Sequence, residues 1–343
     1  MSKSSIEWTQ ETWNPTTGCN KVSQGCKNCY AETMHKRLQG MGQPKYKRDF
    51  NKGVMMHDDA LDYPLTIKKP TMFFVNSMSD LFHDDVTFEF IDKVFATMAA
   101  TPQHTYQVLT KRAEIMKDYF AWKQLVWRNN YQPLPNVWLG VSCEDQTTAD
   151  ERIPYLLKCP AAVRFLSCEP LLGPIDLETI DPESPGGNIG SINAFTGDEN
   201  CFDHSESRGG PIHWVIAGGE SGHGARPMHP EWVRSLRDQC ADADVPFFFK
   251  QWGEYRPFEE TCQAPFYRDC ATGEEHDGHV MNMIDYDHYT ESGLFNGYRW
   301  FPPMDAITYC MDHNNSDCSF LKMGKSKSGN HLNGVQHLNF PTR

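Results

Sequence analysis

Three cysteines stand in one short polar loop near the start of the chain, at residues 17–30. Cys26 and Cys29 have the Cys-x-x-Cys spacing that lets two thiolates grip one metal centre, and Cys19 lies seven residues upstream. A structural zinc site closes its tetrahedron with protein ligands, whereas a four-iron cluster held by three cysteines leaves one iron open. Because no fourth ligand is obvious nearby, the loop favours a 4Fe-4S cluster. Zinc is the alternative, with His35 or a remote cysteine as fourth ligand.

Polar side chains also follow nearly every short apolar run in the first 254 residues. Where strands are parallel, their carboxyl ends meet at one edge of the sheet, so these side chains are expected to share one mouth with the cysteine loop. Each set on its own also fits a helix cap. The sets are Asn76 and Ser77; Lys111 and Arg112; Ser142 and Glu144; Ser167 and Glu169; Gly218, Gly219 and Glu220; and Lys250 and Gln251.

The segment 218–222, Gly-Gly-Glu-Ser-Gly, is the most specific signal among these sets. Paired glycines let a backbone approach a ligand closely, and a carboxylate such as Glu220 can hold an amine or a ribose hydroxyl. A tight turn after a strand is the alternative interpretation.

The elements that must position these residues alternate along the chain. Alternating strands and helices indicate βαβ units with a parallel sheet, and about seven units favour a partial or full (β/α) barrel. The predicted strands lie at 72–76, 106–110, 137–141, 163–167, 214–217 and 245–249, with a first one around 6–13. The predicted helices lie at 30–39, 88–99, 113–126, 148–157 and 230–243.

Two stretches interrupt this alternation. Residues 178–212 are rich in Gly, Pro, Ser, Asn and Asp and are predicted to form an insertion loop. We therefore expect a barrel domain at 1–254 and an irregular C-terminal extension at 255–343 that packs on it. An alternative interpretation of the cysteines and histidines of that extension is that they form a second metal site.

Composition places the chain among ordinary globular enzymes. It has 343 residues, 39% of them hydrophobic, and no apolar run of about 18 residues that would span a membrane. Its first residues lack the apolar stretch of a signal peptide, so we expect a cytoplasmic protein whose twelve cysteines stay mostly reduced.

The net charge of −13 argues against non-specific coating of nucleic acid. Basic residues are nonetheless concentrated at Lys45–Lys52 and at Lys111 and Arg112. This concentration predicts entry of an anionic substrate, one that carries phosphate. A solvated surface loop and local ion pairs are the alternative.

With these motifs in hand, the chain resembles a phage- and prophage-associated family of uncharacterised proteins related to the radical S-adenosylmethionine (SAM) superfamily. The cysteine spacing, Cys-x6-Cys-x2-Cys, is longer than the common Cys-x3-Cys-x2-Cys of that superfamily. The resemblance rests on Ser-Ile-Glu-Trp at 5–8, Trp-Asn-Pro at 13–15, Asn-Ser-Met-Ser-Asp-Leu-Phe at 76–82, Leu-Thr-Lys-Arg at 109–112, Ser-Cys-Glu-Pro-Leu-Leu at 167–172, the segment 218–222 and Gln-Trp-Gly-Glu at 251–254.

The resemblance implies a barrel of radical SAM type and an enzyme that uses a 4Fe-4S cluster and SAM. The open iron would take the amino and carboxylate groups of SAM, and reductive cleavage would give a 5′-deoxyadenosyl radical that removes hydrogen from a substrate. Flavodoxin or ferredoxin would supply the electron. The implied substrate is a modified nucleobase or an amino-acid-decorated thymine in phage DNA. The competing class is a non-catalytic nucleic-acid-binding protein stabilised by zinc or an iron–sulfur cluster.

The resemblance also implies roles for the strand-end residues. Lys111, Glu169 and Glu220 are the catalytic candidates, and Cys19, Cys26 and Cys29 are the metal ligands. The candidates for SAM binding are Asn76, Ser77, Ser142, Glu144, Glu169, Gly218, Gly219 and Glu220.

Overall fold

The computed structural model describes residues 6–182, 190–200, 209–257 and 325–341, together with short strands between 267 and 322. The cysteines and histidines of the predicted second metal site fall in 262–318, where only isolated strands are described, so their side chains lie outside the described residues. Within the described ranges no helix is long and apolar enough to cross a membrane.

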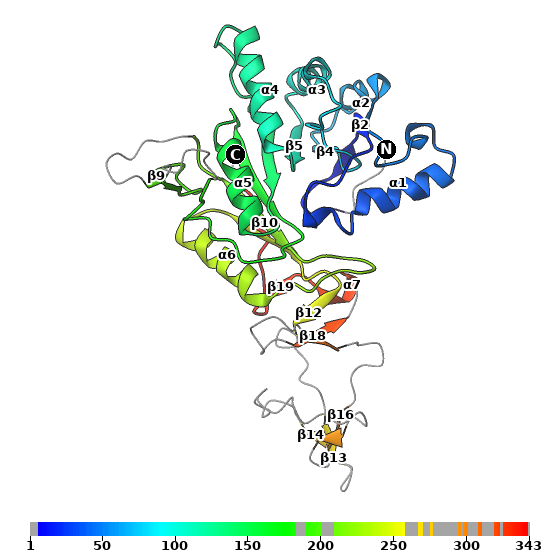
Figure 1. The fold of residues 1–343 in the computed structure, drawn as a ribbon, viewed down its shortest axis with the longest axis vertical. Coiled ribbons are helices and arrows are strands. Elements are labelled where there is room, and N and C mark those ends of the chain that lie inside the picture. Colours follow the sequence, from blue (N-terminus) through cyan, green and yellow to red (C-terminus); the bar gives the residue numbers. More distant parts are fainter. Residues whose placement is uncertain are drawn as a thin grey trace.

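Seven parallel strands form one sheet whose spatial order follows the chain (Figure 1). The sheet curls into a half-barrel, with the first and last strands at its two edges, so the predicted partial barrel is confirmed and a closed barrel is not formed. The strands are β1 (Glu11–Trp13), β4 (Met72–Val75), β5 (Thr105–Thr110), β6 (Val137–Ser142), β7 (Val163–Cys168), β10 (Trp214–Gly218) and β11 (Phe247–Gln251).

Amphipathic helices cover the outer face of this sheet. In α3 (Phe88–Ala100) the Thr87 hydroxyl caps the first turn by accepting the Phe90 N–H, and the apolar face that follows is buried. Its neighbours along the sheet share the same core with the strands. The other long helices are α1 (Tyr30–Gly40), α4 (Ala113–Val126), α5 (Gln146–Leu157) and α6 (Pro230–Asp242).

Two strand predictions were wrong at their starts. The last strand begins at Phe247 rather than at residue 245, and Pro246, which has no N–H to donate, precedes it. The first strand is only Glu11–Trp13, and Trp8 instead packs against the inner face of the sheet.

The βα alternation lapses after β7. In place of a helix, the described part of 169–213 contains the small hairpin of β8 (Ser191–Ile192) and β9 (Glu199–Asn200), within the predicted insertion. The C-terminal extension contains antiparallel strands that the sequence pattern did not predict. These are β12 (Tyr255–Pro257), β13 (Tyr267–Asp269), β14 (Glu275–His276), β15 (Leu294–Phe295), β16 (Tyr298–Trp300), β17 (Thr308–Cys310) and β18 (Ser319–Lys322).

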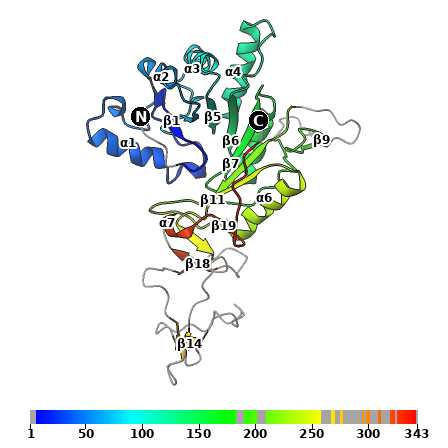
Figure 2. The same cartoon turned by 180° about the vertical axis from the view of Figure 1, so that it is seen from behind.

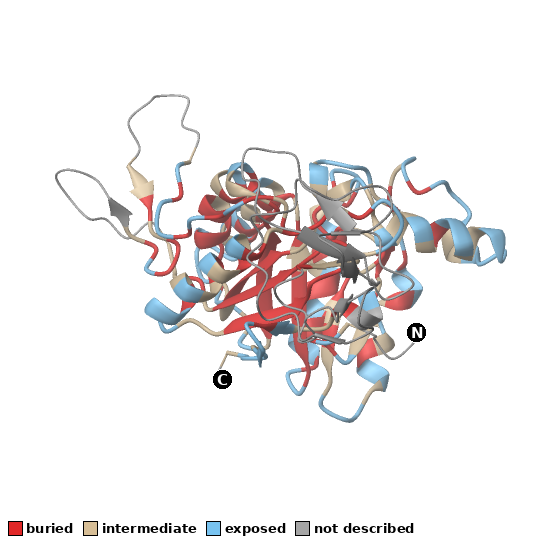
Figure 3. Cartoon of the chain, turned by 90° about the horizontal axis from the view of Figure 1, so that it is seen from below, coloured by how far each residue is buried: buried red, intermediate tan, exposed pale blue. Residues whose placement is uncertain are grey.

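The inner face of the sheet carries a layer of aromatic side chains. Trp214 of β10 lies at its centre, with ring centroids 6.2 Å from Trp8 and 5.9 Å from both Trp138 and Phe165. Figure 3 shows the sheet as the buried centre of the molecule. This layer fills the middle of the half-barrel, so polar groups are left at its ends.

Residues 331–341 return to the sheet and complete the aromatic layer. They run antiparallel to β11, next to which Figure 2 shows β19 (His331–Leu332). The Trp214 indole N–H donates to the Asn339 carbonyl at 2.8 Å, and the Phe340 ring lies 5.1 Å from the Trp214 ring.

The remaining short elements are β2 (Thr16–Thr17), β3 (Met55–Met56), α2 (Tyr63–Thr66), α7 (Lys325–Ser328), β20 (Val335–Gln336) and the 3-10 turns η1 (Gln24–Cys26), η2 (Pro44–Tyr46) and η3 (Asp58–Ala60).

Candidate functional site

The cysteine loop follows β1 and β2 and lies at the carboxyl end of the half-barrel. Cys19, Cys26 and Cys29 are free thiols, each partly exposed. Cys29 is the N-cap residue of α1, and its side chain makes no capping hydrogen bond. Burial raises the pKa of the Cys29 thiol, and the backbone N–H groups of Glu32 and Ala31 in the first turn of α1 oppose that rise because they favour the thiolate.

Cys19 has a cation as its neighbour. The Arg112 guanidinium donates from Nη1 to the Cys19 sulfur at 3.7 Å. Burial and the carboxylate of Asp80 raise the pKa of Cys19 to about 11, while the Arg112 charge opposes the rise. The arginine therefore favours the thiolate, the form that binds metal.

Arg112 is itself held by groups on two sides. Asp80, which is buried, accepts from Arg112 Nη1 at 3.1 Å, from the Thr110 hydroxyl at 2.7 Å and from the Lys111 N–H at 3.1 Å. Arg112 Nη2 also donates to the backbone and side-chain oxygens of Asn20, next to Cys19. Asp80 thus fixes the segment after β5 against the cysteine loop.

Glu144 lies beneath the same loop and is completely buried. Its Oε1 accepts from Lys111 and, at 2.9 Å, from the Ser23 hydroxyl, and its Oε2 accepts from Arg152 at 3.0 Å. A Cβ atom at Gly25 would collide with this carboxylate, so glycine is required where the loop crosses it. Both oxygens of Glu144 are therefore engaged within the protein.

The glycine-rich segment after β10 fastens the other side of the loop. The Glu220 carboxylate accepts from Arg226 Nε at 2.9 Å and Nη2 at 2.7 Å, and the same Nη2 donates to the Gln24 carbonyl at 3.0 Å. Asn28 Nδ2 donates to the Gly224 carbonyl at 2.7 Å. Burial opposes ionisation of Glu220, but Arg226 outweighs it and holds the pKa of this carboxyl below its usual value.

Glu169 forms a separate pair at the end of β7. Lys250 Nζ donates to both of its oxygens, at 2.6 and 2.8 Å, and Gln251 Nε2 lies 3.4 Å from Oε1. Gln251 Nε2 also donates to the Ser221 hydroxyl at 3.1 Å, which connects this pair to the segment that holds Glu220. Gly218 faces the Glu169 carboxyl, and a Cβ at Gly219 would collide with the Trp252 carbonyl.

The remaining strand-end residues lie at the ends of β4 and β6. Asn76 has a positive φ of 63°, and its buried Nδ2 has no hydrogen-bond partner, while its Oδ1 accepts the Thr16 N–H. The Ser77 hydroxyl donates to Asn14 Oδ1 at 3.2 Å. Ser142 is buried and its carbonyl accepts from Arg152. None of these three touches the cysteine loop through a hydrogen bond within the described ranges.

The structure therefore divides the predicted residues into two groups. Lys111, Glu144 and Glu220 contact the cysteine loop directly or through one neighbour, whereas Asn76, Ser77, Ser142, Ser167, Glu169, Gly218 and Gly219 line the strand ends beside it. Sequence reasoning missed Arg152 and Arg226, the cations that partner the two glutamates. The signal was available, because a buried carboxylate needs a cation or hydrogen-bond donors.

The basic segment Lys45–Lys52 is partly neutralised. Lys45 pairs with Asp59 at 2.8 Å and Lys52 pairs with Asp49 at 3.0 Å. Lys111 and Arg112 pair with Glu144 and Asp80. These ion pairs correspond to the alternative interpretation of the basic residues, in which they pair locally and do not form an anion-docking face.

The three cysteines supply, from one loop, the thiolate donors that an iron–sulfur cluster requires. In the part of the chain that the structure describes, no three His, Cys, Asp or Glu side chains converge to hold a single metal ion. A single zinc ion needs its ligands at one point, whereas each cysteine of a four-iron cluster binds a different iron.

Comparison with known proteins gives one family and one solved structure. The model of the family described as "Protein of unknown function (DUF5131)" matches residues 3–341. No curated protein matches the chain. Among solved structures the chain is similar to a mutant of spore photoproduct lyase, with 14% identity over 50% of this chain and 48% of that chain and a TM-score of 0.34.

Proposed function

The chain belongs to the DUF5131 family, and we propose that this member is a radical SAM-type iron–sulfur enzyme. Cys19, Cys26 and Cys29 would hold a 4Fe-4S cluster with one iron free of protein ligands, at which the amino and carboxylate groups of SAM would bind. Such a cluster would supply the electron that cleaves SAM to methionine and a 5′-deoxyadenosyl radical, and the radical would remove hydrogen from the substrate.

One observation carries this proposal. A loop with three free, partly exposed thiols is fastened to the segments after four strands of the sheet, at the carboxyl end of an open parallel half-barrel. The fastening residues are Ser79 after β4, Arg112 after β5, Glu144 after β6 and Arg226 after β10. The carboxyl end is where parallel α/β folds place their chemistry. A stabilising zinc knuckle would not require contacts to so many strands.

The contacts of the strand-end carboxylates support different tasks for them. Glu144 and Glu220 position the loop, because their oxygens are occupied by Lys111, Arg152 and Arg226. Glu169 is partly exposed and can exchange its hydrogen bonds from Lys250 for a ligand hydroxyl or amine. We therefore assign SAM contacts to Glu169 and to the strand-end groups of Asn76, Ser77, Ser142, Gly218 and Gly219, and assign Lys111 to positioning.

Arg112 and the N-terminus of α1 assist the cluster ligands. A cation beside Cys19 and two backbone N–H groups at Cys29 both favour thiolates, which bind iron. For the substrate we propose a modified nucleobase or an amino-acid-decorated thymine in DNA, with flavodoxin or ferredoxin as the electron donor. The enzyme would act in the cytoplasm, with residues 1–254 as its catalytic domain.

Anaerobic reconstitution with iron and sulfide tests the proposal. We expect the wild-type chain to take up close to four irons, to give the electron paramagnetic resonance signal of a reduced cluster, and to release 5′-deoxyadenosine from SAM. Cys19→Ala, Cys26→Ala and Cys29→Ala should each lose the cluster. Cys240→Ala, at a buried cysteine of α6, is the matched control and should keep it. Tight zinc binding with no affinity for SAM would instead establish the competing metal-stabilised binding protein.

A further inference from the structure

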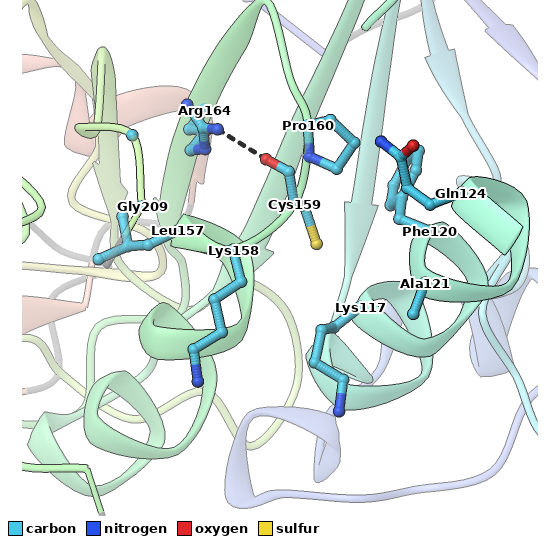
Figure 4. A pocket seen from close by; sticks show the side chains of 11 residues that line it. Lys117, Phe120, Ala121, Gln124, Leu157, Lys158, Cys159, Pro160, Arg164 and Gly209 are labelled. Atoms are coloured by element: carbon cyan, nitrogen blue, oxygen red, sulfur yellow. Dashed lines mark hydrogen bonds between the residues drawn. The ribbon is translucent and has the colours of Figure 1, made fainter. Parts of the chain in front are cut away.

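A second candidate site lies at the opposite end of the sheet from the cysteine loop. A cavity of about 430 Å³ opens between α4, the end of α5 and the start of β7 (Figure 4). The connection from α5 to β7 belongs to the amino ends of the parallel strands, whereas the cysteine loop lies at their carboxyl ends. The volume falls within the range of small-molecule sites.

The lining of this cavity carries three cations and no carboxylate. They are Lys117, Lys158 and Arg164, of which Lys117 also pairs with Asp118, outside the lining, at 2.7 Å. Figure 4 shows the two lysines extending in the same direction, with Arg164 at the other end of the lining. Both ammonium groups lie over the Tyr155 ring, at 5.3 and 5.9 Å from its centroid. In a chain with a net charge of −13, such a concentration attracts anions to this place.

Arg164 is a buried cation without a carboxylate partner in the described part of the chain. Its residue is 9% exposed, and Nη2 donates to the Cys159 carbonyl at 2.6 Å. Its buried Nε has no hydrogen-bond partner. Burial lowers the pKa of Arg164 below its usual value. A buried charge is costly unless it is paired, so this guanidinium is poised for an anion.

Gln124 adds an unpaired acceptor to the same lining. Its Nε2 donates to the Tyr131 carbonyl at 3.2 Å, while its buried Oε1 accepts no hydrogen bond. The remaining lining is mostly apolar, with Phe120, Leu157 and Pro160. A ligand that satisfies both orphan atoms must carry an anionic acceptor for Arg164 and a hydroxyl or N–H donor for Gln124.

We propose that this cavity binds a small phosphate monoester whose body carries a hydrogen-bond donor and one apolar face. The guanidinium of Arg164 takes the phosphate, and Lys117 and Lys158 add charge at the other end of the lining. Gln124 accepts from the ligand body, which packs on Phe120 and Leu157. A nucleoside monophosphate and a sugar phosphate share this chemistry. The site stands independently of the proposed function, because none of its lining residues belongs to the cysteine loop or the strand ends.

Isothermal titration of the full-length chain tests the site with adenosine 5′-monophosphate and ribose 5-phosphate as probes. Saturable binding of either probe at one site per chain is expected, and the tighter of the two identifies the source class. Adenosine, which lacks the phosphate, should bind at least about tenfold more weakly, because a hydrogen bond to a charged group contributes about 1.5–3 kcal/mol. Inorganic phosphate should compete with both probes.

Arg164→Met should weaken binding of the tighter probe by about tenfold or more. A double variant, Lys117→Met with Lys158→Met, changes more exposed residues and should weaken it several-fold even if the Arg164 variant folds poorly. Lys36→Met on α1 removes one positive charge outside the cavity and serves as the matched control. Equal affinity in the Arg164 or double-lysine variant and in wild type, or no saturable binding of either probe by wild type, would overturn the proposal.

Discussion

At the scale of single residues, two side chains of opposite charge act on the pKa of one thiol in the cysteine loop, that of Cys19. Asp80 raises the pKa of Cys19 and Arg112 lowers it, while the two side chains also pair with each other at 3.1 Å. Asp80, which raises the pKa of Cys19, therefore also holds in place the arginine that lowers this pKa. A lysine at 112 would keep the charge but lose the fork that reaches both Asp80 and Asn20.

The first prediction concerns the reactivity of Cys19 in the metal-free protein. Arg112→Gln should slow alkylation of Cys19 by iodoacetamide at pH 8, because the thiolate fraction falls about tenfold for each unit by which the thiol pKa rises. Asp80→Asn should accelerate it. Mass spectrometry of the Cys19 peptide gives both rates, with Cys29 in the same samples as internal control. Unchanged rates in both variants would mean that the guanidinium does not contact the sulfur in solution.

The second prediction is that acid weakens the attachment of the cysteine loop. Burial opposes ionisation of Glu144 and Glu220, but their cationic partners outweigh it and hold both pKa values below that of an ordinary glutamate. A carboxyl with a depressed folded-state pKa contributes stability above its unfolded pKa, about 4.3, and that stability is lost as pH falls through the folded pKa. The urea midpoint should therefore drop below about pH 4.

Glu144→Gln separates this effect from general acid unfolding. Removing one charge from a buried pair costs about 3–5 kcal/mol at pH 7, and the variant should then lose less additional stability on acidification than wild type does. Identical pH profiles of the two proteins would place the acid-sensitive groups elsewhere.

At the scale of elements, α5 shows how local sequence fixes the start of a helix under the site. Asp145 is its N-cap residue, and the Asp145 and Thr148 side chains exchange hydrogen bonds with each other's backbone N–H groups. The same turn places Glu144 one residue before the helix, and Arg152 two turns along it reaches back to that carboxylate at 3.0 Å. The same short segment therefore forms both the start of α5 and the buried ion pair between Glu144 and Arg152.

The third prediction is a cost at this cap. Asp145→Ala should lower the free energy of unfolding by about 1 kcal/mol, because the Thr148 N–H loses the carboxylate that accepts its hydrogen bond. Asp145→Asn, which caps nearly as well, should stay close to wild type. Urea unfolding followed by circular dichroism measures both, and equal stability of the Ala and Asn variants would contradict the capping assignment.

Periodicity predicted the elements well and their mutual contacts poorly. The five long helices lie within two residues of their predicted bounds, because their apolar spacing is strong and their ends carry caps or breakers. The hairpin of β8 and β9 was missed, because strands of two residues have no period to read. Arg152 and Arg226 were missed although their partners, Glu144 and Glu220, lie only 8 and 6 residues away, because periodicity does not show which charged side chains pair.

At the scale of the whole molecule, the half-barrel keeps its two ends distinct by filling its middle. The aromatic layer around Trp214 occupies the inner face, so the cysteine loop lies at one end of the strands and the Arg164 cavity at the other. The apolar character of the layer could be read from alternating aromatic positions in the strands. The part played by Phe340 could not, because it belongs to a segment without regular spacing.

The fourth prediction tests the contribution of Phe340 to the aromatic layer. Phe340→Ala should destabilise the chain by about 1–2 kcal/mol, because it removes ring contacts to Trp214 and to Phe248, at 5.1 and 5.4 Å. The tryptophan emission should also shift to longer wavelength as water reaches the indole. Phe340→Leu, which restores much of the apolar volume, is the matched control. An Ala variant with unchanged stability and emission would show that the tail does not seal the layer.

The hydrogen bond from Trp214 to Asn339 joins residues 125 positions apart. At a synthesis rate of about 5–20 residues per second, the indole is synthesised roughly 6–25 seconds before its acceptor. During that interval one face of the nascent sheet presents Trp138, Phe165 and Trp214 without the cover that residues 331–341 supply. Such a surface is what chaperones bind. The half-barrel is therefore expected to depend on holding factors during translation more than a fold whose core closes through local contacts.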